Sequence, residues 1–152
     1  MTHLITYKRT DSTDPDFHKL IGELDRDLTI RNGAEQAKFA EFNTVDKIKC
    51  VIIAYQNSTP VGCGGFKNTT EQAEIKRMYV NATLRGQHIG EKILVELETW
   101  AQELGFKSAI LETGVNQTEA QNLYKKLGYT ITPNYGPYLN FADSICMKKI
   151  FK

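Results

Sequence analysis

Hydrophobic residues recur at helical spacing in two long segments of the chain. The first begins at Pro15, and its apolar positions are Phe17, Leu20, Ile21, Leu24 and Leu28. The second begins at Ile89, and its apolar positions are Ile93, Leu97, Trp100, Ala101 and Leu104. A period of about 3.6 residues is typical of an amphipathic helix, and Gly33 and Gly105 follow as helix-ending glycines. The pattern therefore predicts two long helices, each with one face against a core.

Shorter apolar and β-branched segments predict strands between and around these helices. They span residues 4–8, 49–55, 61–67, 73–80, 107–112, 129–132 and 144–150. The polar residues 56–60 predict a hairpin turn, and residues 34–42 and 118–127 predict two short helices. This order predicts an α/β or α+β fold with one mixed sheet, in which segment 73–112 is a right-handed crossover between parallel strands.

Composition and charge narrow the class of protein. The chain has 152 residues, a net charge of +1, 41% hydrophobic residues and 24% charged residues. We expect a single domain over residues 1–152 with a sizeable core, and the near-neutral charge argues against nucleic-acid binding. No segment resembles a signal peptide, and none has the roughly 18 consecutive apolar residues of a membrane span. We therefore expect a cytoplasmic protein without a membrane partner.

The three cysteines show neither the spacing of a metal site nor the pattern of a catalytic cysteine. Cys50, Cys63 and Cys146 stand singly in apolar or β-prone segments, without the spacing of a metal site. We therefore expect buried free thiols and no bound metal. Neither a nucleophile elbow nor a Cys–His pair is visible, so the sequence does not support a serine or cysteine hydrolase.

The loop between the strand at 73–80 and the helix from Ile89 is unusual, because its residues 85–90 read Arg-Gly-Gln-His-Ile-Gly. The first N–H groups of a helix lack internal partners and lie at the positive end of the helix dipole, so the loop favours a phosphate or pyrophosphate. Its glycines let a ligand approach the backbone, and Arg85 adds a cation. The spacing fits neither the dinucleotide fingerprint nor the P-loop, and a glycine-flanked helix start alone is weak evidence.

The loop resembles the acetyl-CoA signature of the GNAT superfamily of N-acetyltransferases. That signature is Gln/Arg-x-x-Gly-x-Gly/Ala, and it stands here as Arg85-Gly86-Gln87-His88-Ile89-Gly90. The strand at 73–80 and the segment 116–129 are also similar to segments of this family. His88 departs from the pattern, because it replaces the inner glycine. Since the start of a helix has negative φ, we expect His88 to fit without backbone strain.

The resemblance implies a mixed, mostly antiparallel sheet with flanking helices, in which the parallel strands ending near Val80 and Thr113 splay apart. It implies acetyl-CoA as co-substrate, with the pantetheine arm in the gap. The N–H groups of Met78 and Val80 would bind the thioester oxygen, and Asn116 would bind the pantetheine arm or cap the following helix. The residues implied at the pyrophosphate are Arg85, Gly86, Gln87, His88, Ile89, Gly90 and Glu91.

The resemblance also implies catalytic side chains for acetyl transfer to a primary amine by direct attack in a ternary complex. Glu74 has the position of the family's general base, and Glu112 on the neighbouring strand is its rival. Tyr124 matches the family's general acid, which would protonate the coenzyme A thiolate. Structural roles stay open for all three: a solvated edge for Glu74, support of the splayed strands for Glu112, and a core aromatic for Tyr124.

The acceptor is expected to be a small-molecule or peptide amine, with a homodimer as a further option. The family's acceptor pocket corresponds here to residues 25–42 and 134–141. Residues there that would attract a cation or cover an apolar group are Asp25, Asp27, Glu35, Glu41, Tyr135, Tyr138 and Phe141. A solvated helix face also explains the four acids.

Two other functions remain open. A non-catalytic acyl-CoA-binding sensor or interaction module would keep the anion loop but would not need Glu74 and Tyr124. An unrelated α/β enzyme with a phosphate-bearing ligand would be stabilised by a nucleotide and not by acetyl-CoA.

Overall fold

The computed structural model describes residues 4–32, 48–69 and 71–152. The expected helix over 34–42 therefore lies outside the described residues, as do Glu35 and Glu41. The elements in chain order are β1 (Ile5–Thr10), α1 (Pro15–Asn32), β2 (Cys50–Gln56), β3 (Thr59–Asn68), β4 (Ala73–Val80), η2 (Ala82–Leu84), α3 (Ile89–Glu103), β5 (Ser108–Gly114), α4 (Thr118–Lys126), β6 (Thr130–Thr132), η3 (Gly136–Tyr138) and β7 (Ser144–Ile150).

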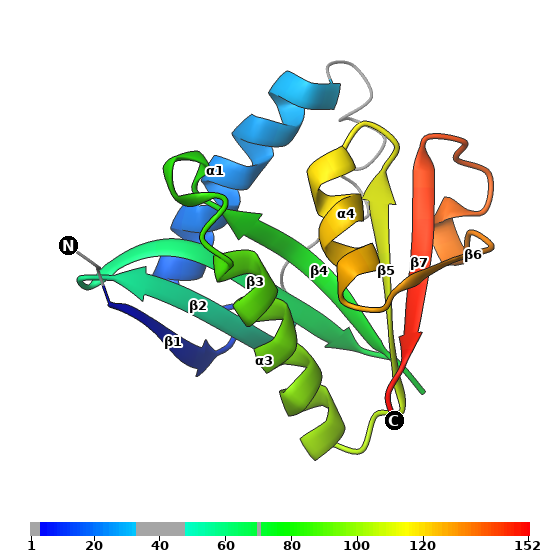
Figure 1. Ribbon diagram of the computed structural model, residues 1–152, viewed down its shortest axis with the longest axis horizontal. Coiled ribbons are helices and arrows are strands. Elements are labelled where there is room, and N and C mark those ends of the chain that lie inside the picture. Colours follow the sequence, from blue (N-terminus) through cyan, green and yellow to red (C-terminus); the bar gives the residue numbers. More distant parts are fainter. Residues whose placement is uncertain (1–3, 33–47, 70) are drawn as a thin grey trace.

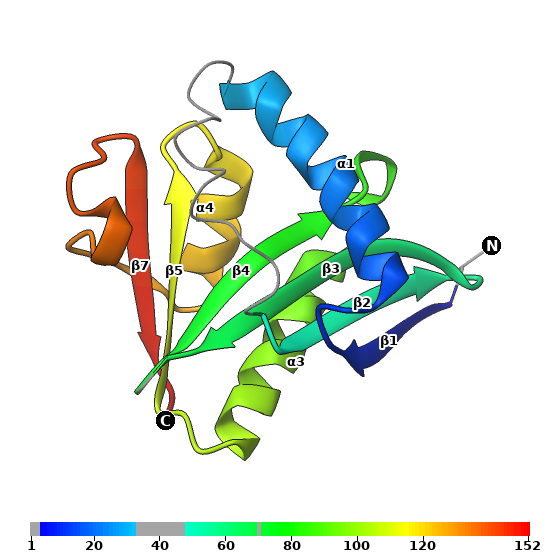
Figure 2. The same cartoon turned by 180° about the vertical axis from the view of Figure 1, so that it is seen from behind.

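The described strands form one seven-stranded sheet in the order β1-β2-β3-β4-β5-β7-β6. All neighbouring strands are antiparallel except β4 and β5, which are parallel. Helices α3 and α4 cover one face of the sheet (Figure 1), and α1 covers the other (Figure 2). The predicted mixed, mostly antiparallel sheet with flanking helices is confirmed.

The parallel pair opens into a fork. Strands β4 and β5 pair only from Ala73↔Ala109 to Ile75↔Leu111, and beyond this point they diverge (Figure 1). Strand β4 continues beside β3 as far as Val80, and β5 continues beside β7 as far as Gly114. Each strand thus keeps one partner while its other edge faces the gap. The predicted splay is confirmed.

The β2–β3 hairpin is tighter than the sequence indicates. Asn57 and Ser58 have φ of 50° and 72°, so the turn has two residues with positive φ, and β3 already begins at Thr59. Such a turn matches the right-handed twist of the flanking strands. A bulge between Ala54 and Tyr55 accommodates Pro60 in the ladder.

Glycines in β3 let α3 and the Met78 side chain lie close to the sheet. A Cβ at Gly64 would overlap the Met78 sulfur and lie 3.0 Å from Cγ2 of Ile93. A Cβ at Gly62 would lie 3.0 Å from the Tyr79 carbonyl oxygen and 3.2 Å from Cδ1 of Ile93. The sequence Val-Gly-Cys-Gly-Gly at 61–65 therefore serves close packing beside the fork.

Two cores fill the two faces of the sheet. The core under α3 and α4 contains Ile93 and Leu97, and the core under α1 contains Phe17 and Leu20. Cys50 belongs to the core under α3 and Cys63 to the core under α1, and both of them and Cys146 are buried free thiols, as predicted. Burial raises the pKa of the Cys63 thiol to about 12.

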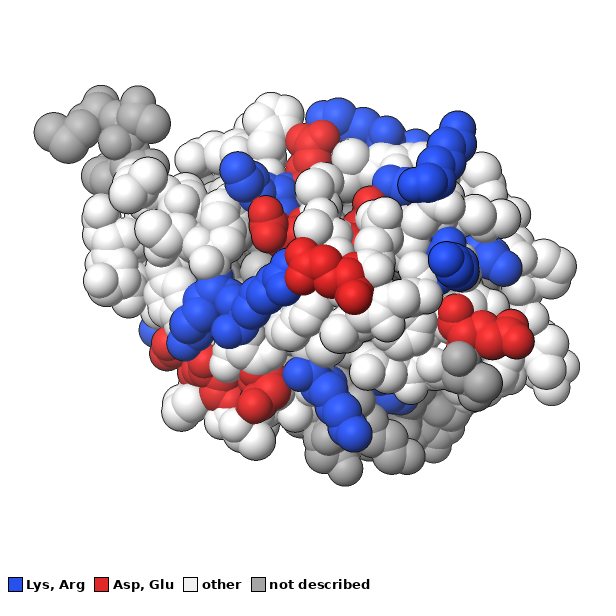
Figure 3. All heavy atoms as spheres, turned by 90° about the horizontal axis from the view of Figure 1, so that it is seen from below, with Lys and Arg blue, Asp and Glu red and all other residues white. Residues whose placement is uncertain are grey.

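On the face seen in Figure 3, basic and acidic side chains are interspersed. No helix within residues 4–32, 48–69 and 71–152 is long and apolar enough to cross a bilayer.

Candidate active site

A cleft of about 430 Å³ opens between α1, β4, the loop after β4, α3 and α4. Predicted residues that line it are Met78, Val80, Arg85, Gly86, His88, Ile89, Gly90, Glu91 and Tyr124. Gln87, Asn116 and Glu74, which were also predicted, do not line it. The cleft therefore joins the loop expected at the pyrophosphate to the phenol expected at the thiolate.

The backbone at the start of α3 corrects one expectation. His88 has φ 64° and ψ 18°, which is left-handed, and not the negative φ expected for the start of a helix. The inner glycine of the signature corresponds to a position where the chain needs positive φ, and a histidine at such a position stores strain of about 1 kcal/mol. The prediction that His88 fits without strain is wrong.

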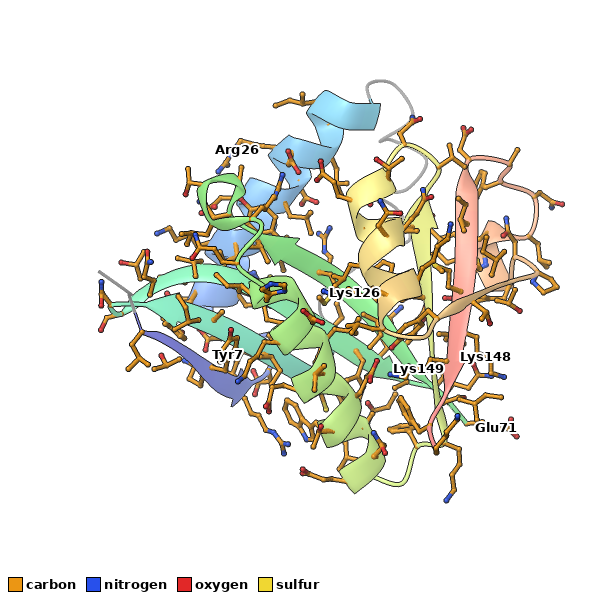
Figure 4. The ribbon with its side chains drawn as sticks, viewed as in Figure 1. Tyr7, Arg26, Glu71, Lys126, Lys148 and Lys149 are labelled. Carbon is orange, nitrogen blue, oxygen red and sulfur yellow. The ribbon has the colours of Figure 1, made fainter. Side chains whose placement is uncertain are left out.

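Polar side chains at the mouth of the cleft link α3 to α4. His88 Nδ1 lies 2.9 Å from Oε2 of Glu91, and the Lys126 ammonium donates to the same oxygen at 3.4 Å (Figure 4). The hydrogen bond from His88 and the Lys126 charge lower the pKa of the Glu91 carboxyl. The mouth thus has a histidine and a lysine beside the first N–H groups of α3.

The Arg85 guanidinium, which the sequence predicts as a cation for the ligand, already has protein partners. Its Nε donates to the Val80 carbonyl at 3.0 Å, and its guanidinium lies 3.3 Å from the Asp27 carboxylate of α1. Its charge is therefore partly balanced, and the side chain joins the loop to α1 beside the cleft.

A backbone N–H group of β4 faces the fork. The Asn81 N–H donates to the Val61 carbonyl at 2.8 Å, so it points towards β3. Successive N–H groups of a regular strand point to opposite edges, so that of Val80 points to the edge of β4 that β5 leaves unpaired. Between Tyr79 and Lys76 the β3–β4 register shifts and Arg77 has a φ of 60°, so this alternation does not fix the direction of the Met78 N–H.

The Tyr124 side chain lies in the α3 core and reaches the cleft. It is 6% exposed, and its ring packs edge-to-face on Tyr129, with centroids 5.9 Å apart. Burial and the charge of Glu112 raise its pKa. No described residue hydrogen-bonds to its hydroxyl. A buried tyrosine usually has a partner for its O–H, so this phenol is available to a ligand.

The residue before α4 is not the one expected to cap it. Gln117 occupies the N-cap position, whereas Asn116 is exposed, so the capping role considered for Asn116 is wrong. The Gln117 amide oxygen accepts from the Thr113 hydroxyl at 3.1 Å, and Gln117 lines the cleft.

Glu74 and Glu112 lie on the α1 face of the sheet, opposite the face on which Tyr124 packs. Glu74 accepts from the Tyr135 hydroxyl at 3.2 Å and lies 3.5 Å from the Lys76 ammonium. Glu112 accepts from the Ser144 hydroxyl at 2.8 Å. Burial raises the pKa of the Glu112 carboxyl.

Two acids of α1, Asp25 and Asp27, pair with arginines. Asp25 binds both terminal nitrogens of Arg77, at 2.8 and 3.3 Å, and Asp27 pairs with Arg85. These contacts fasten α1 to β4 and to the loop, so the two acids have structural partners where an acceptor amine was expected.

Comparison with known proteins identifies the family. A family model described as "Acetyltransferase (GNAT) family" matches residues 15–129. The chain belongs to the GNAT family of acetyltransferases. It is 37% identical over 134 residues to the "IAA acetyltransferase" of Azospirillum brasilense, which covers 86% of this chain and 88% of the relative.

Solved GNAT structures share the fold. A candidate acyl-CoA N-acyltransferase of Klebsiella pneumoniae has a TM-score of 0.82 and 27% identity, and the match covers 98% of this chain and 99% of the other. The PaiA N-acetyltransferase of Thermoplasma acidophilum, solved with coenzyme A, has a TM-score of 0.75 and 16% identity over 97% and 99% of the two chains.

This GNAT chain is an acetyl-CoA-dependent acetyltransferase, because acetyl-CoA is the co-substrate of the family. The cleft, the Val80 N–H at the fork and the Tyr124 hydroxyl, which has no hydrogen-bond partner among the described residues, fit that co-substrate. In the part of the chain that the structure describes, no group of His, Cys, Asp or Glu could hold a metal ion.

Sequence reasoning missed a stripe of cleft residues on α4 and the α1 wall. They are Gln117, Glu119, Ala120, Leu123 and Lys126 of the α4 region, and Leu24 of α1. The α4 residues recur at helical spacing on the side of Tyr124, and this spacing is the signal that could have identified them.

Proposed function

We propose that the chain acts as one N-acetyltransferase domain over residues 1–152 and moves the acetyl group of acetyl-CoA to a primary amine by direct attack in a ternary complex. The observation that carries this proposal is the fork. Tyr124 reaches the fork from the α3–α4 face of the sheet, and the carboxylates Glu74 and Glu112 lie on the α1 face. A coenzyme and an amine can therefore reach one opening from two sides.

The coenzyme side provides binding groups in order along the cleft. The loop residues Arg85 to Glu91 would hold the pyrophosphate, with Lys126 as an added cation. The N–H groups of Met78 and Val80 would stabilise the thioester oxygen as negative charge develops on it. Binding both reactants in one site can supply roughly 7 to 11 kcal/mol of rate enhancement when they are well aligned.

The proton-handling groups suit the chemistry. An alkylammonium has a pKa near about 10 and must lose a proton before it can attack, so a carboxylate is needed as base. The sequence-based prediction is Glu74, with Glu112 as its rival. Tyr124 would supply a proton to the departing thiolate, and its unpartnered hydroxyl supports that role.

Direct attack is favoured over a covalent acyl-enzyme. Cys50, Cys63 and Cys146 are buried, and none of them lines the cleft. Burial raises the pKa of all three thiols, which suppresses the reactive thiolate.

A panel of amines offered with acetyl-CoA, with free thiol release as readout, tests the proposal. The panel comprises polyamines, aminoglycoside-like amines, amino acids and peptide N-termini. We expect at least one amine to release thiol well above the rate without amine. Stabilisation by acetyl-CoA without release by any amine would favour the non-catalytic sensor.

A further inference from the structure

Buried polar side chains gather on the α1 face of the sheet at the fork. In β4, Ala73 and Ile75 belong to the core under α3, so Glu74 and Lys76 lie on the opposite face. The same alternation places Glu112 of β5 beside them. We call this group the fork cluster, and its members are Glu74, Lys76, Glu112, Tyr135 and Tyr138.

Within the fork cluster, the Glu74 carboxylate already has an ion-pair partner and a hydrogen-bond donor. It lies in the paired part of the strands, opposite Ile110, and is only 9% exposed. Its carboxylate faces the Lys76 ammonium at 3.5 Å and accepts from the Tyr135 hydroxyl. Both contacts hold the Glu74 side chain in place below the opening.

Glu112 stands at the opening itself. It is the first residue of β5 after the last β4 pair, Ile75↔Leu111, and it is half-buried. Ser144 donates to it, and no described residue forms a salt bridge with it. The cluster has two carboxylates and one ammonium, so Glu112 is the carboxylate left for a cationic ligand.

Charged and titratable groups face Glu112 from four elements. They are Glu74 and Lys76 of β4, Tyr138 of η3, Cys146 of β7 and Tyr124 of α4. The Lys76 charge favours the ionised carboxylate, whereas burial and Glu74 oppose it, and burial is the largest effect. Tyr124 belongs to the core under α3 and lines the cleft, so it lies on the other side of the fork from Glu112, whose charge raises the pKa of the phenol.

We infer that Glu112, and not Glu74, takes the proton of the acceptor ammonium, and that the Lys76–Glu74 pair positions the acceptor side of the fork. This inference rests on the proposed function and names its base. The site would take a cationic primary amine that enters from the α1 face.

The step balances as follows. The Glu112 carboxylate takes one proton from R–NH₃⁺. The nitrogen lone pair forms the C–N bond to the acetyl carbon while the C–S bond breaks with its electron pair going to sulfur. Tyr124 gives its proton to the thiolate and regains the second proton that the nitrogen loses. The products are R–NH–CO–CH₃ and coenzyme A thiol, and Glu112 releases its proton to water.

The test measures kcat/KM against pH for the wild type, Glu112→Gln, Glu112→Asp and Glu74→Gln, with an amine that the panel identifies. A general base is worth roughly 10² to 10⁴ in rate, so we expect a loss of that size for Glu112→Gln at pH 7. That loss should shrink about tenfold per pH unit as the free amine increases. Glu112→Asp should keep the acidic limb of the profile with an intermediate rate. Glu74→Gln should lose less than about tenfold and keep the limb.

Acetyl-CoA-induced thermal stabilisation, measured on each variant, shows that the variants fold and bind coenzyme. An active wild type from which Glu112→Gln loses the same factor at every pH would overturn the inference and leave the proposed function intact. A loss in Glu74→Gln that shrinks about tenfold per pH unit would do the same and assign the base to Glu74. A wild type that releases no thiol with any amine would overturn the proposed function and this inference together.

Discussion

The His88 imidazole lies 2.9 Å from the Glu91 carboxylate, although the His88 backbone has a left-handed φ of 64°. Only glycine adopts this conformation without strain, and the GNAT signature has glycine here. Strained residues often lie at ligand sites because surrounding contacts hold them in place. The contact between Nδ1 and Glu91 holds the imidazole at the mouth of the cleft. An N–H group of the ring could donate a hydrogen bond to a phosphate oxygen there.

The variants His88→Gly and His88→Ala distinguish the effect of backbone strain on stability from the effect of the imidazole on acetyl-CoA binding. Both variants lose the side chain, so both should bind acetyl-CoA several-fold more weakly, as measured by calorimetric titration. Only glycine relieves the left-handed backbone, so His88→Gly should be more stable than His88→Ala by about 1 kcal/mol in urea unfolding. Equal stability of the two variants would contradict the strain, and wild-type affinity in both would exclude His88 as a ligand.

Gly90 has room for a methyl group but not for a large side chain in the presence of coenzyme. A Cβ there would meet only Leu123 and Val80, each at 3.5 Å, which is an ordinary contact. Gly90→Leu should fold and lose acetyl-CoA affinity by at least about tenfold, because its side chain projects into the cleft, whereas Gly90→Ala should lose far less. Thermal shift with and without acetyl-CoA measures both effects. If Gly90→Leu binds acetyl-CoA like the wild type, the loop is not the pyrophosphate site.

Tyr124→Phe should lower turnover with little effect on stability. The hydroxyl has no partner among the described residues, so its removal breaks no hydrogen bond of the protein. Loss of a general acid should reduce kcat about 10²-fold or more and leave acetyl-CoA binding nearly intact. Stopped-assay thiol release and thermal unfolding measure the two effects, and unchanged kcat would remove Tyr124 from the mechanism.

Tyr129→Phe is the matched control for this tyrosine. Its hydroxyl donates to the buried Glu98 carboxylate at 2.9 Å, and Lys149 of β7 donates to the other oxygen at 2.8 Å (Figure 4). Removing the hydroxyl should cost about 1 to 3 kcal/mol of stability, because one buried oxygen loses its donor. We therefore expect opposite results for the two variants: Tyr124→Phe should lose turnover and keep stability, whereas Tyr129→Phe should lose stability and keep turnover.

Asp25→Asn should destabilise the protein more than Asp27→Asn. The Arg77 side chain is 7% exposed and depends on Asp25 for both terminal nitrogens, whereas the side chains of Arg85 and Asp27 are 33% and 32% exposed. We expect a loss of about 2 kcal/mol for Asp25→Asn and under about 1 kcal/mol for Asp27→Asn in urea unfolding. Equal losses would mean that Asp25 does not fasten α1 to β4.

Glu112→Gln should stabilise the protein at neutral pH. Burial raises the pKa of Glu112 above its usual 4.5, so the folded state holds this proton more tightly than the unfolded state. Ionised Glu112 therefore destabilises the folded state increasingly as pH rises through the folded-state pKa. The melting temperature of Glu112→Gln should exceed that of the wild type at pH 7, and the difference should disappear below about pH 4.

Glu103→Gln should change the melting temperature at pH 7 in the opposite direction from Glu112→Gln. The hydrogen bond from Arg9 lowers the pKa of Glu103, so this carboxylate stabilises the folded state above its usual pKa and loses that contribution in acid. Its replacement should lower the melting temperature slightly at pH 7.

If Glu112→Gln also lowers the melting temperature at pH 7, the prediction for Glu112 is wrong. That result would show that the Glu112 side chain stabilises the splayed strands through its hydrogen bond.

Local patterns were sufficient for most of the elements. The strands Ala73–Val80 and Ser144–Ile150 and the start of α3 at Ile89 match the predicted bounds, because alternation and helical periodicity depend on neighbours in sequence. The signature at 85–90 identified the loop for the same reason. The missed boundary at Thr59 reflects a two-residue turn, whose positive φ values no hydrophobic pattern encodes.

The sequence by itself determined the order of elements, the anion loop and the family, since each is written in short runs of residues. Only the tertiary structure decided which charges meet. Asp25 and Asp27 pair with arginines more than 50 positions away, and Glu74 is joined to Tyr135 across 61 positions while Glu112 stands at the fork. Such pairings depend on strand register and on which edge each strand leaves open, and these follow from the packing of the whole sheet.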